Sequence, residues 1–88
     1  MSSSVINQLV ESLSEISQDT YVPQNVRTRA QTVSQVLQDD KESIETRKNR
    51  ALQHLEDMAI DSNIDMSTRT FIYQALSMVE SLSGNGKK

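Results

Sequence analysis

A pattern that occurs twice along the chain constrains its fold most. Residues 19–30 read DTYVPQNVRTRA and residues 61–72 read DSNIDMSTRTFI. We use the term repeat shift for the offset that places Asp19 on Asp61 and moves every other residue forward by the same number of positions. It superposes an aspartate, a hydroxyl residue, a β-branched apolar residue and an Arg-Thr pair. It also superposes apolar positions outside these stretches: Leu13 on Leu55, Ile16 on Met58 and Leu37 on Val79. A unit of about 40 residues that holds two helices is typical of HEAT-type repeats, so the pattern predicts two similar helix hairpins.

Apolar residues recur with helical spacing in four segments, and this spacing predicts four helices. The stripes are Val5, Ile6, Leu9, Leu13 and Ile16; Val26, Ala30, Val33 and Leu37; Ile44, Ala51, Leu52, Leu55 and Ala59; and Ile72, Ala75, Leu76, Val79 and Leu82. No segment shows the alternation of a strand.

The helix ends are marked by capping residues. Pro23 is expected to open the second helix, because a proline in the first turn gives up no needed hydrogen bond. Candidate N-caps are Asp40 or Ser43 for the third helix and Asp65 or Ser67 for the fourth, which should stop near Gly84.

The predicted fold class is all-α, with four antiparallel helices built from two similar hairpins, because the connections between the helices are short. We expect one domain over residues 1–83, with hairpins at 4–38 and 43–83 and a flexible tail at 84–88. A solenoid usually needs three or more repeats. Two HEAT-like hairpins must therefore close face to face as a four-helix bundle, or leave a face for another chain.

Composition excludes several classes of function. Nine basic and twelve acidic residues give a net charge of -3, which is too balanced for bulk attraction to nucleic acid or to acidic membranes. The absence of cysteine rules out disulfides, thiolate catalysis and cysteine-based zinc sites. No apolar run reaches the roughly 20 residues that a membrane-spanning helix needs. We expect a cytoplasmic protein that does not enter a membrane.

The repeated aspartates and arginines form the first candidate site. Arg27 and Arg69 fall in the first turns of their helices, where a positive charge opposes the helix dipole. The favoured interpretation is structural ion pairs, Asp19 with Arg27 and Asp61 with Arg69. The alternative is an anion site at paired helix N-termini, where arginines and free N–H groups bind a phosphate or a carboxylate.

A second candidate is a basic patch formed by Arg27, Arg29, Arg47 and Arg50. Nucleic-acid modules usually add aromatic side chains or many more positive charges, and the sequence has neither near these residues. A solvated face is therefore favoured, and a small accessory factor for nucleic acid is the alternative function.

Catalytic chemistry is not expected. His54, Asp57 and Asp61 share one side of a helix, but ligands from a single helix rarely hold a metal alone. One histidine without a positioned partner makes no catalytic triad. We therefore predict a protein that is not an enzyme and that uses no cofactor or metal.

Four apolar residues are candidates for a contact surface, since they lie off or at the edge of the main stripes: Val10, Ile60, Tyr73 and Met78. We expect some of them to meet a partner, most readily a second copy, with a dimer favoured. Met58, Met66 and Met78 are expected to fill the core, with an adaptable docking surface as the alternative. The predicted function is a non-enzymatic interaction module that self-associates and presents a helical face to protein partners.

Two stretches also support a resemblance to a known family. Asp19-Thr20-Tyr21-Val22-Pro23-Gln24-Asn25-Val26-Arg27 and the later segment from Asp61 to Arg69, in a chain of this length, resemble uncharacterised protein family zero-one-four-seven of small archaeal proteins. The resemblance implies a single all-helical domain in an archaeal cytoplasm, with no assigned activity. This chain carries Asp65 where members of that family commonly carry proline.

Overall fold

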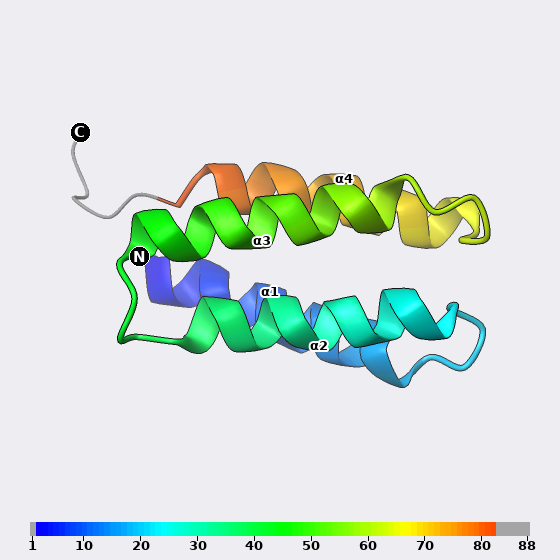
Figure 1. Ribbon diagram of the computed structural model, residues 1–88, viewed down its shortest axis with the longest axis horizontal. Helices are drawn as coiled ribbons and strands as arrows, with labels where there is room; N and C mark the ends of the chain where they lie inside the picture. The colour runs from blue at the N-terminus through cyan, green and yellow to red at the C-terminus, as the bar shows by residue number, and fades with distance from the viewer. Residues whose placement is uncertain (1, 83–88) are drawn as a thin grey trace.

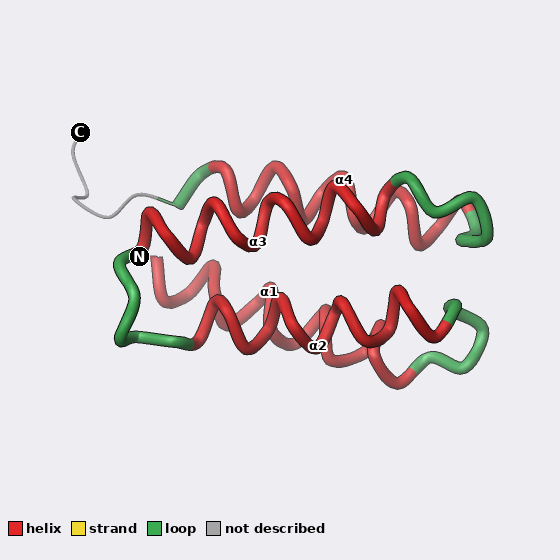
Figure 2. The backbone as a smooth tube through the Cα atoms, in the orientation of Figure 1, coloured by secondary structure: helices red, strands yellow, loops and turns green. Residues whose placement is uncertain are grey.

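The structure is a computed structural model that describes residues 2–82, and it is all-helical over them. The helices are α1 (Ser2–Gln18), α2 (Gln24–Gln38), α3 (Ile44–Ala59) and α4 (Met66–Glu80). Figure 2 shows them joined by three short loops, with no strand among the described residues. The predicted all-α class and the four helices are confirmed.

The helices run antiparallel and form a closed bundle (Figure 1). Each helix packs against the next one along the chain, and α1 also contacts α4, so the ring of four closes. The assembly measures 38 × 20 × 19 Å. Two hairpins, α1 with α2 and α3 with α4, thus cover each other's apolar faces, which is one of the two arrangements open to a chain with only two repeats.

Two of the loops end in side-chain caps. The Ser43 hydroxyl accepts a hydrogen bond from the backbone N–H of Thr46 at 3.1 Å, and an Asp65 carboxylate oxygen accepts one from Thr68 at 3.2 Å. Of the paired candidates, these two residues are therefore the caps. Pro23 lies immediately before α2 and supplies no side-chain bond.

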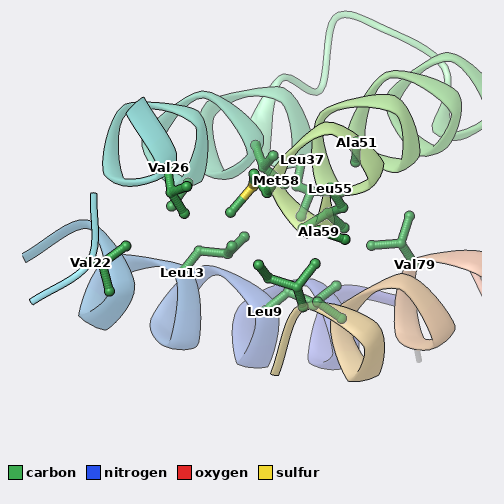
Figure 3. Close-up of a cluster of buried hydrophobic side chains, with 14 of the residues drawn as sticks. Leu9, Leu13, Val22, Val26, Leu37, Ala51, Leu55, Met58, Ala59 and Val79 are labelled. Carbon is green, nitrogen blue, oxygen red and sulfur yellow. The ribbon is translucent and has the colours of Figure 1, made fainter. Parts of the chain in front are cut away.

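The core follows the repeat shift at the level of single positions. The buried residues of α2 are Val26, Ala30, Val33 and Leu37, and the repeat shift carries them onto the buried residues of α4, which are Thr68, Ile72, Ala75 and Val79. Leu9 and Leu13 of α1 likewise match Ala51 and Leu55 of α3, and all four are buried. Figure 3 shows Leu9 and Leu13 reaching from α1 toward Leu55 and Met58 of α3.

The last helix ends earlier than the sequence suggested. α4 stops at Glu80, and Leu82 just beyond it is buried and still part of the core. The expected stop near Gly84 and the expected tail at 84–88 lie outside the described residues.

Candidate interaction surface

The three loops between helices are built in the same way. They begin at Asp19, Asp39 and Asp61. In each, one carboxylate oxygen accepts a hydrogen bond from the backbone N–H two residues later, at 3.0 Å from Tyr21, 3.2 Å from Lys41 and 2.8 Å from Asn63. Such a bond mimics a backbone turn, which is why aspartate suits this position.

An arginine completes each loop eight residues after its aspartate. The Nε of Arg27 donates to the carbonyl of Val22 at 3.0 Å, and the Nε of Arg47 donates to that of Glu42 at 3.1 Å. Arg69 donates through Nη2 to the Asp61 carbonyl at 3.0 Å. The guanidinium groups thereby satisfy loop carbonyls that no helix bonds, which ties each loop to the helix that follows it.

The predicted ion pairs are corrected by this geometry. The arginines reach their loops through backbone carbonyls, and among the described residues neither Asp19 with Arg27 nor Asp61 with Arg69 forms a carboxylate–guanidinium bridge. The physical reason is orientation, because one carboxylate oxygen of each aspartate accepts from a loop N–H group while each guanidinium group donates to a loop carbonyl. The same bonds engage the arginines that the alternative anion site would need.

The predicted basic patch does not form as one cluster. Arg47 also donates through Nη1 to the Leu37 carbonyl at 3.0 Å, which places it at the C-terminal end of α2. Arg27 lies near the N-terminal end of α2. It is ten residues from Leu37, which is roughly 15 Å along the helix axis. Arg29 faces α3, and Arg50 is exposed on α3. The antiparallel packing separates residues that the sequence could only count together.

Hydrogen bonds lower the pKa values of two carboxyl groups in the loop between α3 and α4, those of Asp61 and Asp65. Hydrogen bonds from the backbone of Asn63 and the side chain of Asn25 lower the pKa of Asp61, and the nearby charge of Arg69 lowers it further. Hydrogen bonds from Thr68 lower the pKa of Asp65. Both groups are stabilised in the ionised form because it accepts these bonds.

A polar cluster joins the two hairpins between α2 and α3. Arg29 Nη1 lies 2.9 Å from His54 Nδ1 and 3.4 Å from Asp57 Oδ2, and Asn25 Nδ2 donates to Asp61 Oδ2 at 2.8 Å. Since arginine can only donate, Nδ1 of His54 is the acceptor and the ring proton sits on Nε2. The three residues considered as metal ligands are thus engaged by α2.

Within residues 2–82 no group of three or more histidine, aspartate or glutamate side chains could hold a metal ion. Every side-chain nitrogen or oxygen that is buried in that range has a hydrogen-bond partner. Among the described helices, none combines the length and apolar character needed to cross a membrane.

The groove along the first hairpin is polar and uncharged. A shallow groove between α1 and α2 is lined by Ser and Gln side chains with one valine: Val10, Ser14, Ser17, Gln18, Gln31, Ser34, Gln35 and Gln38. We call Ser14, Gln18, Gln24, Gln31 and Gln38 the first-hairpin face, where Gln24 precedes Gln31 by two helical turns on the same side of α2.

The equivalent face of the second hairpin is apolar and acidic. The repeat shift carries the first-hairpin face onto Glu56, Ile60, Met66, Tyr73 and Glu80, which we call the second-hairpin face. Ile60 is 79% exposed, Met66 83% and Tyr73 56%, and these are three of the four large apolar side chains that are exposed among the described residues. The half-buried Leu52 and Leu76 stand where the first hairpin has Val10 and Ser34.

The residues predicted as a contact surface are divided by the fold. Ile60 and Tyr73 lie on the second-hairpin face. Val10 lines the groove between α1 and α2, and Met78 packs against the core. Met66 was expected in the core, with a docking surface as the alternative, and the structure shows it exposed. Sequence reasoning did not identify Tyr21, which is 96% exposed in the first loop, as a surface residue.

Comparison with known proteins places the chain in a family. The model of the uncharacterised protein family UPF0147 matches residues 1–82. The chain belongs to this family. The resemblance inferred from the two loop segments is therefore confirmed.

Relatives of the UPF0147 family match along nearly their whole length. The UPF0147 protein TV0625 of Thermoplasma volcanium is 37% identical over 94% of this chain and 93% of its own length. The UPF0147 protein TK2131 of Thermococcus kodakarensis is 38% identical over 89% of this chain and 95% of its own length. A crystal structure of the unknown-function protein MMP1188 is 30% identical, with a TM-score of 0.86 and 92% of each chain covered.

Proposed function

We propose that this UPF0147 protein is a non-enzymatic interaction module that presents the second-hairpin face to a protein partner. One observation carries the proposal: three large apolar side chains are exposed together on one hairpin, whereas the equivalent positions of the other hairpin hold glutamine. The bundle closes without these side chains, since they lie outside the core and the buried positions of α2 and α4 coincide. Clustered apolar exposure on a small protein is typical of a contact surface.

The positions of the side chains support one continuous surface. Met66 and Tyr73 are seven residues apart on α4, so they share a side of that helix. Ile60 follows α3 at the position equivalent to Gln18, which lines the same groove as Gln31, the counterpart of Tyr73. Tyrosine and methionine are both enriched in protein interfaces, and together with isoleucine they offer apolar area that a partner can cover.

Photo-crosslinking in living cells tests the proposal. A photoreactive phenylalanine analogue replaces Tyr73 in one variant and Gln31 in the matched control, because both residues are exposed at equivalent positions. We expect covalent adducts with a protein from position 73 and none above background from position 31. Equal adducts from both positions, or none from position 73, would contradict the proposal.

Self-association is read from the same experiment. An adduct of twice the mass of the chain would identify a second copy as the partner. Adducts of other masses would identify a different protein, whose crosslinked segment can be sequenced.

A further inference from the structure

We infer that the second-hairpin face binds a basic amphipathic helix, that is, a partner segment with an apolar stripe flanked by lysine or arginine. The inference rests on the proposed function and names the chemistry of the partner. It follows from the charge around the exposed apolar side chains and from the contrast with the first hairpin.

The rim of this face is acidic. Glu56 lies one helical turn before Ile60, and Glu80 lies two turns after Tyr73 on the same side of α4. Both glutamates are exposed. The nearest arginine of α4, Arg69, is half-buried and donates to the Asp61 carbonyl, so it contributes one positive charge that is already hydrogen-bonded. The exposed charge next to the apolar residues is therefore negative.

The first hairpin shows that the fold does not require a charge at these two positions. Ser14 stands at the position equivalent to Glu56, and Gln38 at the one equivalent to Glu80. The first hairpin does carry exposed acidic residues on α1, Glu11 and Glu15, but the described part of that helix exposes no large apolar side chain beside them. The second hairpin differs because its glutamates stand beside exposed apolar side chains. Complementary charge steers a partner toward a surface and fixes its orientation, and a positive partner satisfies the glutamates.

The arrangement of the apolar side chains suits a helix. The antiparallel helices α3 and α4 each add a half-buried leucine that packs against the core, Leu52 and Leu76, to the exposed apolar side chains of this hairpin. An amphipathic helix presents apolar residues every three to four positions and can cover such side chains. Nucleic acid is disfavoured here, because its phosphates would meet the glutamates.

Other occupants fit less well. A second copy that pairs through the same face would oppose Glu56 and Glu80 with glutamates of its own, and like charges in contact disfavour association. The last six residues of the chain, SGNGKK, are partly basic but contain no apolar side chain that could cover Ile60 or Tyr73.

Titration of the isotope-labelled full chain with designed peptides tests the inference. The probe is an amphipathic peptide of leucine and lysine, about 18 residues or roughly 27 Å as a helix. Two control peptides replace lysine by glutamate or scramble the order. We expect the lysine peptide alone to shift the amide signals of Ile60, Met66 and Tyr73 and to leave those of Gln18, Gln24 and Gln31 unchanged.

Two variants assign the binding to the face. The double variant Ile60→Gln, Tyr73→Gln copies the first hairpin, so it should fold normally, and we expect it to weaken binding by more than about tenfold. Glu56→Gln with Glu80→Gln should weaken binding about fivefold at low salt and less at high salt. The matched control, Gln31→Ala with Gln38→Ala, should leave the affinity unchanged.

Each other outcome would overturn the inference. Equal binding of the glutamate peptide, shifts spread over other surfaces, or no binding at all would reject a basic amphipathic helix. Shifts of the same amides on raising the protein concentration without peptide would identify a second copy as the occupant. Crosslinks from position 73 to a partner segment that is neither basic nor amphipathic would reject the inference and leave the proposed function intact.

Discussion

The first and second hairpins share an interior and differ on the outside. The repeat shift carries every buried residue of α2 onto a buried residue of α4. The outer faces differ at three positions, which are exposed in both hairpins. They hold polar side chains in the first hairpin and apolar ones in the second, with Ile60 at the position of Gln18, Met66 at that of Gln24 and Tyr73 at that of Gln31. The interior positions are set by packing, which both hairpins must satisfy.

The difference between the two outer faces indicates where a binding role can reside in a very small protein. A chain of 88 residues has little interior to spare, because almost every core side chain is needed for stability. A face that is exposed in both hairpins can vary without loss of packing. The two hairpins are therefore expected to respond equally to substitutions inside and unequally to substitutions outside.

The largest effect is expected in the core. Leu13 and Leu55 are fully buried and equivalent, so Leu13→Ala and Leu55→Ala should each lower the free energy of unfolding by about 2–5 kcal/mol. Urea denaturation followed by circular dichroism measures both. Costs that differ by more than about 2 kcal/mol, close to the full spread found among buried leucines, would break the equivalence of the two interiors.

Removal of the loop arginines should have the next largest effect. Arg47→Ala leaves two carbonyls without their donor, whereas Arg27→Ala and Arg69→Ala leave one each. We expect a loss of about 1–3 kcal/mol for Arg47→Ala and a smaller loss for the other two. Thermal melts of the three variants give the order, and an Arg47 variant as stable as wild type would contradict it.

Acid should destabilise the second hairpin through its own carboxylates. The pKa values of Asp61 and Asp65 are lowered by folding, so the unfolded chain binds protons more readily than the native chain at low pH. Their contribution to stability is therefore complete above about pH 4 and declines as the pH falls below it. Asp61→Asn with Asp65→Asn should flatten this part of the stability profile, measured by melting temperature from pH 6 to pH 2. A profile as steep as that of wild type would show that these two carboxylates do not cause the loss of stability at low pH.

The smallest effect on stability is expected from exchanging the faces. Gln18→Ile, Gln24→Met and Gln31→Tyr would give the first hairpin the exposed apolar residues of the second, and all three sites are exposed. The free energy of unfolding should change by less than about 0.5 kcal/mol, because surface substitutions touch no packed group. Chemical denaturation checks this. A large loss would mean that the first-hairpin glutamines have a structural role.

The fold was predictable because its main determinants are local. Apolar spacing indicates the four helices, and the repeat shift indicates which positions match. The loop between α2 and α3 does not follow that shift, because its Asp39 lies between the other two loop aspartates and nearer to Asp19 than to Asp61. Arg47 was consequently assigned to a basic patch, although its spacing from Asp39 equals that of Arg27 from Asp19 and reveals its role.

The candidate site was predictable only in part. Ile60 and Tyr73 fall off their helical stripes and could be found by spacing alone. Whether Val10 shares their surface depends on which helices are neighbours, and that follows from tertiary packing. The loop aspartates and arginines were found as a pair, but their bonding partners are backbone atoms, which carry no signature in the side-chain sequence.

The order in which the helices pack has a consequence for how the chain acquires its structure. Each helix contacts the one that immediately follows it, and only the meeting of α1 with α4 joins distant parts of the chain. Proteins dominated by such near-neighbour contacts have low contact order and fold within about microseconds to milliseconds. The first hairpin is complete at Gln38, so it can begin to assemble while the second is still being synthesised. The hairpin with the apolar outer face is synthesised after its packing partner, which shortens the time for which that face is exposed on an incomplete fold.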